Sequence, residues 1–439
     1  MAKLEQFRDP ELSLWQSAVD EVVARKQAGA QAQEAGGAQA VTRPDPGHSM
    51  VKLAAQHAKR VQDAGLNSEV APVPPAPAKA TEGIGEVVEY CASLARNYAV
   101  AKFKGDDEAA QRYHEQLTTQ FTVCDPGWVD TAVKYAEFLA SRKQVPYRVY
   151  QNIGDYVIDG KLPAKARVAL VGDWGTGQVE AKRVLAQIAR KNPDVVVHLG
   201  DIYYSATDFE VQNYFFNIWA GLLDVKRIPT FTLSGNHDMF GGGAPFYKLL
   251  DQLGQPASYF CLRNQNWQFI ALDTGLNDRV PNGSVPTFLQ DTEVAWLKDK
   301  LDNRQGRRSV LLSHHQLFAA YEDICGKAVN ERLNQQLAPL LPNVDIWFWG
   351  HEHNLVIYEK YMGVLARCVG HGAFPVTPPE IPAQPKFPEV PVKNIKLDLD
   401  EDGTFYTHGY VLMDLDGASA KITYYQDTDE DEPQYTETL

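Results

Sequence analysis

The sequence predicts a layered α/β fold whose functional residues lie along one edge of a sheet. Short apolar runs alternate with helical patterns through the C-terminal two thirds of the chain, and this alternation is typical of α/β folds. Five polar motifs each directly follow one of the apolar runs. Ligands of such folds bind at the carboxyl ends of the strands, so the same pattern also indicates where the site lies.

Five apolar runs are predicted to be strands buried on both faces, because each is short, nearly continuous and apolar. In chain order they are Val168–Val171, Val195–Leu199, Pro229–Leu233, Val310–Leu312 and Val344–Trp349. Amphipathic helices are predicted between several of them, where apolar residues recur at helical spacing. These helices cover Glu180–Lys191, Thr292–Leu301 and Leu333–Leu341.

The N-terminal region is predicted to be helical and separate from the strands. Helical patterns cover Leu12–Lys26, Met50–Ala64, Ile84–Phe103, Glu108–Phe121 and Val129–Arg142. Segments rich in Ala, Gln, Gly and Pro follow the first two and are typical of linkers. The predicted organisation is helical segments and linkers in 1–83, a small helical unit in 84–150, the strand-containing domain in 151–427 and an acidic tail in 428–439.

The last part of the strand-containing domain combines an irregular loop with a hairpin. Pro375–Pro391 is rich in proline and is predicted to lack regular structure. His408–Asp414 and Ala420–Tyr425 are predicted to pair as a β-hairpin around Asp416-Gly417. These strands would complete the sheet.

The polar motifs are rich in carboxylate, amide and imidazole groups. They read Gly172–Gly175, Gly200–Tyr204, Gly235–Asp238, Ser313–His315 and Gly350–His353. Oxygen and imidazole donors suit iron, manganese or zinc. Two such ions about 3.5–4 Å apart can hold the attacking and leaving oxygens of a phosphoryl transfer. The candidate ligands are Asp173, Asp201, Asn236, His314, His351 and His353.

These motifs, in this order, resemble those of the calcineurin-like metallophosphoesterases over Ala166 to Asp427. Within that superfamily the chain is most similar to the purple acid phosphatases. Other branches carry a histidine two residues after the first aspartate, where this chain has Gly175. The purple branch instead uses a tyrosine three residues after the second aspartate, where this chain has Tyr204. The resemblance implies a four-layer α/β/β/α metallophosphoesterase sandwich behind the helical N-terminal region.

The resemblance also implies a role for each motif residue. Asp201 would bridge two metal ions. The first ion would be iron, and its other ligands would be Asp173, Tyr204 and His353. The second would be iron, zinc or manganese, and its other ligands would be Asn236, His314 and His351. His237 and His315 would contact the phosphate or the leaving group, and a metal-bound hydroxide would be the nucleophile.

Several other residues near the motifs have a structural interpretation. His198 lies inside an apolar run and is predicted to be a core histidine, and Tyr203 is expected only to pack. Tyr204 itself could be a wall residue of the site. Asp273 is predicted to support a ligand by hydrogen bonding, while His371 fits either the site wall or a turn. Surface placement is expected for the remaining histidines, His48, His57, His114 and His408.

The charge of the chain argues against nucleic acid as a partner. The formal net charge is −14, and the five motifs contain no Lys or Arg. Nucleic-acid-binding proteins normally present basic patches to the phosphate backbone. A small-molecule phosphate ester is therefore the expected substrate. The N-terminal helical region could cap the site, form an oligomer or bind a partner.

A reducing, cytoplasmic location is expected. The N-terminus lacks the apolar stretch of a secretory signal, and no apolar run reaches the length of about 18 residues that a membrane helix needs. The five cysteines are far apart, which is typical of reduced thiols. This expectation departs from the many purple acid phosphatases that are secreted.

The first functional expectation is hydrolysis of a small phosphomonoester at a dinuclear metal centre. The alternative is a small phosphodiester, such as a cyclic nucleotide or a glycerophosphodiester. A third possibility is a non-catalytic, protein-binding scaffold on the same fold. Scaffolds of that kind lose ligands, whereas this chain keeps a full set.

Overall fold

The computed structural model describes residues 106–118, 143–278, 286–401, 403–428 and 432–439, with scattered positions between 90 and 141. The chain forms two compact units, Met1–Ser141 and Arg142–Leu439. Within the first unit, helix α4 (Asp107–Thr118) falls on the helical pattern predicted from Glu108. The remaining N-terminal predictions lie wholly or largely outside the described residues.

The second unit contains two β-sheets. The seven-stranded sheet has the order β1 (Val157–Asp159), β5 (Phe260–Arg263), β6 (Trp267–Ala271), β7 (Arg308–Leu312), β8 (Ile346–Trp349), β10 (Ala366–Val369) and β9 (Leu355–Ile357). The six-stranded sheet has the order β13 (Tyr435–Thr438), β12 (Ser419–Gln426), β11 (Gly409–Asp416), β2 (Lys165–Val171), β3 (Val195–His198) and β4 (Thr230–Thr232). Strands β2, β3 and β4 are parallel, as are β6, β7, β8 and β10.

Helices lie along the sheets and in the connections. The first group is α6 (Val179–Arg190), α7 (Asp208–Glu210), the π-helix η1 (Val211–Phe216), α8 (Asn217–Leu222), α9 (Asn236–Phe240) and α10 (Ala244–Leu253). The second is α11 (Asp291–Asp302), α12 (Glu331–Leu337) and the short 3-10 helices η2 (Leu341–Asn343) and η3 (Pro378–Glu380). The three helices predicted in this domain are confirmed as α6, α11 and α12.

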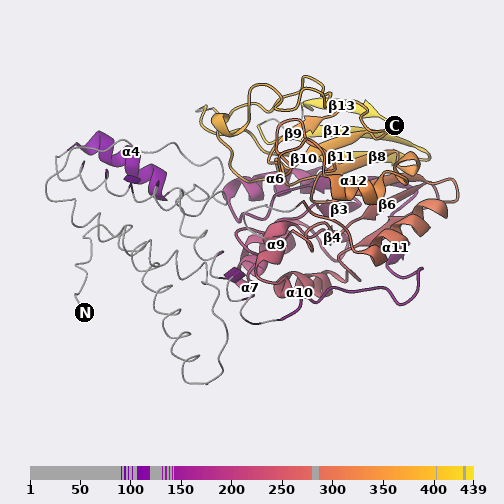
Figure 1. The fold of residues 1–439 in the computed structure, drawn as a ribbon. Helices are drawn as coiled ribbons and strands as arrows, with labels where there is room; N and C mark the ends of the chain where they lie inside the picture. The colour runs from indigo at the N-terminus through magenta and orange to yellow at the C-terminus, as the bar shows by residue number, and fades with distance from the viewer. Residues whose placement is uncertain are drawn as a thin grey trace, which may run out of the picture. The chain divides into compact units, whose positions relative to one another are not determined.

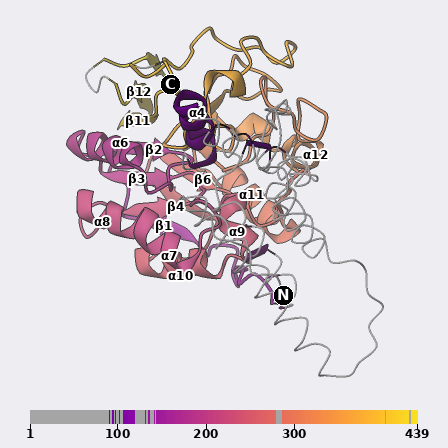
Figure 2. The same ribbon diagram turned by 90° about the vertical axis from the view of Figure 1, so that its left-hand side faces the viewer.

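Side-chain alternation along the strands produces four layers. In β2, Leu170 faces a core between the two sheets, while Val171 faces a core shared with α6 and α8. In β7, Leu312 faces the inter-sheet core, while Leu311 faces a core shared with α11 and α12. Because successive strand residues point to opposite faces, each sheet is apolar on both sides. The predicted α/β/β/α sandwich is confirmed (Figures 1 and 2).

The C-terminal hairpin is confirmed and extends further than predicted. Strands β11 and β12 pair antiparallel, and β11 also pairs with β2 at the middle of its sheet. Residues expected to be part of an acidic tail form β13, which pairs with β12. Pro375–Pro391 contains only the short helix η3, as its prolines predict.

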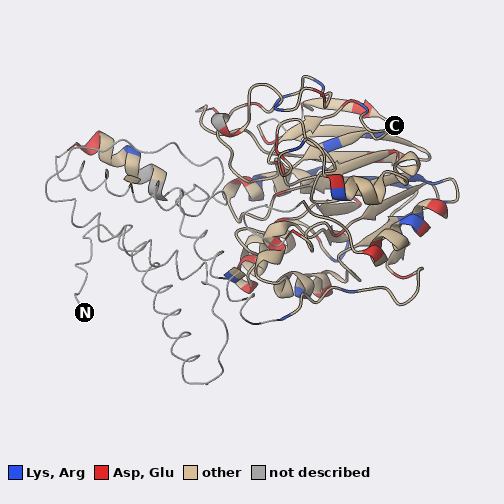
Figure 3. Ribbon diagram, viewed as in Figure 1, with Lys and Arg blue, Asp and Glu red and all other residues tan. Residues whose placement is uncertain are grey.

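Charged side chains of both signs are interspersed along the outer helices, for example along α11 (Figure 3). Within the described part of the chain, no helix combines the length and the apolar character that a membrane span requires.

An ion pair crosses between the two sheets. The guanidinium of Arg367, on β10, donates to both carboxylate oxygens of Glu437, on β13, at 2.7 and 2.6 Å. The same guanidinium donates to the carbonyl oxygens of Tyr358 and Ala366, and the hydroxyl of Tyr424 donates to Glu437. Arg367 is buried, so it depends on these acceptors for its solvation.

Replacing Glu437 should therefore destabilise the fold. We expect Glu437→Gln to lower the free energy of unfolding by about 3 kcal/mol, because it leaves a buried guanidinium without its counter-charge. Asp416→Asn is the matched control, since it breaks the exposed pair between Lys165 and Asp416 and should change stability by less than about 0.5 kcal/mol. Urea unfolding measures both, and equal midpoints for the two variants would contradict the prediction.

Candidate metal centre

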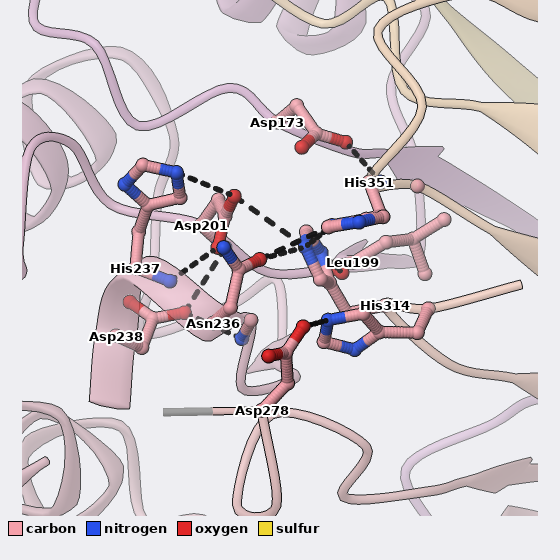
Figure 4. A network of polar contacts seen from close by, with 12 residues as sticks. Asp173, Leu199, Asp201, Asn236, His237, Asp238, Asp278, His314 and His351 are labelled. Atoms are coloured by element: carbon pink, nitrogen blue, oxygen red, sulfur yellow. Dashed lines mark hydrogen bonds and ion pairs between the residues drawn. The ribbon is translucent and has the colours of Figure 1, made fainter. Parts of the chain in front are cut away.

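Each predicted motif lies in the loop at the carboxyl end of a strand. Asp173 follows β2, Asp201 follows β3, and Asn236 and His237 follow β4 at the start of α9. His314 follows β7, while His351 and His353 follow β8. Among the candidate metal ligands, the carboxylates and the amide thus follow strands of the six-stranded sheet, and the imidazoles follow strands of the seven-stranded sheet. Their side chains meet in one cluster, which Figure 4 shows in part.

Three of these residues have left-handed backbone. The φ angle is 54° at Asp173, 74° at Asp201 and 65° at His351. Such conformations cost non-glycine residues about 1–3 kcal/mol each and persist where the surroundings enforce them. Here the hydrogen bonds of the cluster enforce them. For example, the backbone N–H of His351 donates to Asp173 Oδ2 at 2.9 Å.

One group of donors consists of Asp173, Asp201 and His353. One ligand atom from each lies within 4.8 Å of the other two. Asp173 Oδ1 is 3.4 Å from His353 Nε2. Asp173 is fully buried and His353 is half-buried, so the group lies at the base of the site with one side toward solvent.

The second group consists of Asn236, His314 and His351. Asn236 Oδ1 is 3.2 Å from His314 Nε2 and 3.1 Å from His351 Nδ1 (Figure 4). The two imidazole nitrogens are 3.3 Å apart. Asp201 Oδ2 is 3.4 Å from His314 Nε2, so this carboxylate contacts both groups. A shared carboxylate is what a pair of closely spaced cations requires.

The residues present fit metal ions. His314 Nδ1 donates to the carbonyl oxygen of Leu199 at 3.0 Å, so Nε2, which faces Asn236 and Asp201, is the ring nitrogen that would bind a metal ion. Metal-binding histidines are normally oriented in this way, with one ring nitrogen hydrogen-bonded and the other free to ligate. The donors are carboxylate, amide and imidazole, which suit iron, zinc or manganese.

The buried charges of the cluster depend on one another. Burial alone would raise the pKa of Asp201, but the charges of His314 and His237 hold it well below its usual range. Burial would lower the pKa of His314, yet Asp201 and Asp173 raise it to about 9. Burial and the neighbouring Asp201 raise the pKa of Asp238 to about 8.

Asp238 is a site residue that the sequence analysis did not identify. Its carboxylate accepts the backbone N–H groups of Gly235, Asp201 and Ile202 at 2.7, 3.0 and 3.2 Å. It therefore joins the Asp201 loop to the Asn236 loop. Its role was not apparent from the sequence, because helix α9, whose first turn contains Asp238, is too short to be predicted.

His237 faces the carboxylate shared by the two groups. Its backbone N–H donates to Asp201 Oδ1 at 3.1 Å, and its Nδ1 lies 2.7 Å from the carbonyl oxygen of Tyr204. Its Nε2 is 3.8 Å from Asp201 Oδ2. The backbone contact fixes the ring so that Nε2 is directed into the site.

His315 lies beside the second group, but both of its ring nitrogens have partners. Nε2 is 3.0 Å from Asp278 Oδ2, and Nδ1 is 3.0 Å from Thr274 Oγ1. Its ring centroid is 4.4 Å from that of His351. Asp278 was not identified from the sequence, because it belongs to none of the five motifs.

The two adjacent tyrosines contribute differently. Tyr204 contributes backbone contacts, since its N–H donates to Glu210 and its carbonyl oxygen contacts His237. The hydroxyl of Tyr203 lies 3.0 Å from Asp173 Oδ1 and 2.8 Å from His353 Nε2. The expectation that Tyr203 only packs is therefore wrong, because its hydroxyl reaches two candidate ligands.

His198, His371, His408 and Asp273 lie in the described part of the chain, whereas His48, His57 and the side chain of His114 lie outside it. His198 is buried and contacts Thr232, as predicted for a core histidine. Asp273 accepts a hydrogen bond from Ser234, two residues before Asn236. His371 is fully enclosed, and burial lowers its pKa to about 3. The surface placement predicted for His408 is wrong, because His408 is buried and contacts the carbonyl oxygen of Phe374.

Comparison with known proteins gives one family match. Residues 166–355 match the family model described as calcineurin-like phosphoesterase. No curated protein matches the chain.

Several solved structures are similar. GAP50, the anchor in the inner membrane complex of Plasmodium, has 15% identity and a TM-score of 0.43 over 63% of this chain and 88% of that one. A dimetal phosphatase from Danio rerio has 14% identity and a TM-score of 0.43 over 62% and 98%. PhoD has 12% identity and a TM-score of 0.41 over 60% and 66%.

The close packing of the cluster makes Gly235 a sensitive position. A Cβ atom there would lie 1.9 Å from Asp201 Oδ1, although the backbone angles, φ −100° and ψ −177°, are open to any residue. Gly235→Ala should displace Asp201 and lower metal affinity about 10–100-fold, as changes beside metal ligands typically do. Gly221→Ala, where a Cβ meets nothing within 4 Å, is the control and should bind metal normally. Metal titration of both proteins measures the difference, and equal affinities would contradict this account of the glycine.

Proposed function

Residues 166–355 belong to the calcineurin-like phosphoesterase family, and from this premise we propose that the protein hydrolyses a small phosphomonoester. Metal-dependent hydrolysis of a phosphate ester is the activity that the family match supports. Two clusters of possible ligands support two metal ions, one of Asp173, Asp201 and His353 and the other of His314, His315 and His351. The observation that carries the proposal is the position of Asp201, whose carboxylate contacts both groups.

The proposed ligands divide between the two groups. Asp201 would bridge the ions, with Asp173, His353 and a tyrosine of the Tyr203–Tyr204 pair completing the first site. The ligands Asn236, His314 and His351 would complete the second. When bound, the ions supply positive charge for the phosphate and lower the pKa of water enough for it to attack. We further propose that the ion in the first site, which includes the tyrosine, is iron, as in a purple acid phosphatase-like enzyme.

The side chains around the ligands can position and protonate the substrate. The Nδ1–H of His237 donates to the carbonyl oxygen of Tyr204 and directs Nε2 at Asp201 Oδ2, so the ring in its protonated form could donate the Nε2 proton to the leaving oxygen. His315 is held by Asp278 and Thr274, so we assign it to the wall beside His351 and the phosphate. The absence of Lys and Arg from the motifs favours a small substrate, because little beyond the metal ions would attract a polyanion.

Turnover of simple esters tests the substrate class. Metal-loaded protein should hydrolyse an aryl phosphomonoester faster than the matching aryl phosphodiester. Asp201→Asn is the control, and it should lose at least one metal ion and lower turnover by several orders of magnitude with the fold intact, because it removes charge shared by both ions. If the diester is hydrolysed faster, the protein is a small-molecule phosphodiesterase and the monoester proposal is wrong. Metal-loaded protein that turns over neither ester would favour the protein-binding scaffold.

The role of His237 can be tested separately. His237→Ala should lower turnover about 10²–10⁴-fold, because general acid catalysis typically contributes a rate factor of that size. The protein should still bind two metal ions. The loss should shrink for esters with good leaving groups, which need no proton. A leaving-group series measures this. An equal loss across the series would exclude the acid role, and a lost metal ion would make His237 a ligand.

A further inference from the structure

We propose that Tyr147 is a positioning residue for the second metal ion, on which it acts through the buried carboxyl groups of Glu293 and Asp273. Tyr147 lies outside the five motifs, in residues 143–156, the segment that leads into β1. The inference rests on the proposed function, since it takes the two-metal centre as given.

The loop after β6 supplies no candidate ligand, but it is held against the loop that carries Asn236. Asp273 Oδ1 accepts a hydrogen bond from the hydroxyl of Ser234, two residues before Asn236. Gly275 packs on the same loop, because a Cβ there would lie 2.4 Å from the carbonyl oxygen of Gly235. The position of the Asn236 loop therefore depends on the position of Asp273.

The residue between these two, Thr274, is held against the other ligand loop of the second site. Its Oγ1 accepts the backbone N–H of His315 at 3.0 Å and also lies 3.0 Å from His315 Nδ1. His315 directly follows the candidate ligand His314, and its ring lies beside the ring of His351. Residues 273–275 thus support ligand loops from both sheets, and such outer contacts orient metal ligands.

Glu293, in the first turn of α11, connects this loop to Tyr147. Its Oε1 accepts the backbone N–H of Asp273 at 2.8 Å, and its Oε2 accepts the hydroxyl of Tyr147 at 3.1 Å. Glu293 and Asp273 are both fully buried. Burial and the neighbouring Asp273 hold the pKa of Glu293 well above its usual range. A buried carboxyl group needs hydrogen-bond partners for its oxygens, and Tyr147 supplies one of them.

Further contacts dock the segment that carries Tyr147 on the sandwich. The Tyr147 ring stacks on the ring of Tyr259, with centroids 5.7 Å apart. The guanidinium of Arg148 donates to Asp251 Oδ1 at 2.7 Å. These contacts should keep the segment docked when the Tyr147 hydroxyl is removed, so the effect of its removal can be assigned to the hydrogen bond with Glu293.

Deletion of single hydroxyl groups from the full-length protein tests the proposal. Zn²⁺ would be titrated calorimetrically into metal-free wild type, Tyr147→Phe and Tyr150→Phe. Tyr147→Phe should weaken binding of the second ion about 3–10-fold, the size of one hydrogen bond, and leave the first unchanged. Tyr150→Phe is the matched control and should bind both ions normally, because its hydroxyl has no hydrogen-bond partner among the described residues. Asn236→Ala, which should keep only the first ion, identifies the two binding steps.

A second set of variants tests whether Tyr147 acts through Glu293. Glu293→Gln keeps an acceptor for the N–H of Asp273 and should bind the second ion about as tightly as the wild type. Glu293→Leu removes the acceptor and should weaken the second ion about 10–100-fold. Adding Tyr147→Phe to Glu293→Leu should cause no further loss, because the hydroxyl has already lost its partner.

Equal affinity for the second ion in the wild type and Tyr147→Phe would overturn the proposal, as would an equal loss in Tyr150→Phe. Weaker binding of both ions by Tyr147→Phe would also overturn it, because the hydroxyl would then act on the whole fold. A further loss in the double variant would exclude the route through Glu293. The Tyr147→Phe and Tyr150→Phe arms decide the question even where Glu293→Leu does not fold. Failure of the proposed function would look different, since the wild type itself would bind fewer than two ions or hydrolyse no ester.

Discussion

The structure of the site depends on one carboxylate. Asp201 adopts a left-handed backbone conformation, accepts the N–H of His237, and lies against ligand groups from both sheets. Asp238 fixes the loop that carries it. Gly235 has no Cβ and so leaves room for Asp201 Oδ1. Gly350 leaves room for Asp173 Oδ2 in the same way, because a Cβ at position 350 would lie 2.5 Å from that oxygen. The glycines at these two positions are thus a consequence of where the carboxylates lie.

The position of the site between the sheets follows from the strand order. Strands β2, β3 and β4 are neighbours in one sheet, and β7 and β8 are neighbours in the other. Both sets are parallel within themselves, so their carboxyl ends bring together loops that are far apart in the sequence. The inter-sheet core of Leu170, Val197 and Phe348 lies directly below these ends and sets their separation. Substitutions in that core should therefore shift the positions of the candidate ligands.

The sequence allowed the five motif-bearing strands β2, β3, β4, β7 and β8 and the motif loops to be predicted, because buried parallel strands are continuous apolar runs. Strands β1, β5, β9 and β13 and helices α7 to α9 were not predicted, since they have too few residues to show a period, and the longer helix α10 was not predicted either. Asp278 contacts His315 only through tertiary packing, and no spacing reveals such a contact. The contacts of the Tyr203 hydroxyl with Asp173 and His353 likewise arise only from tertiary packing.

The origin of the donors in two sheets links metal binding to folding. A fragment containing only Asp173, Asp201 and Asn236 would lack every imidazole ligand, so neither site would form until both sheets had joined. Such long-range contacts are made late, because the chain must first close large loops. Metal ions that bind only the completed sandwich also stabilise it, by about 2.7 kcal/mol at a free concentration 100 times the dissociation constant. The supply of metal in the surroundings would thus set the lifetime of the folded protein as well as its activity.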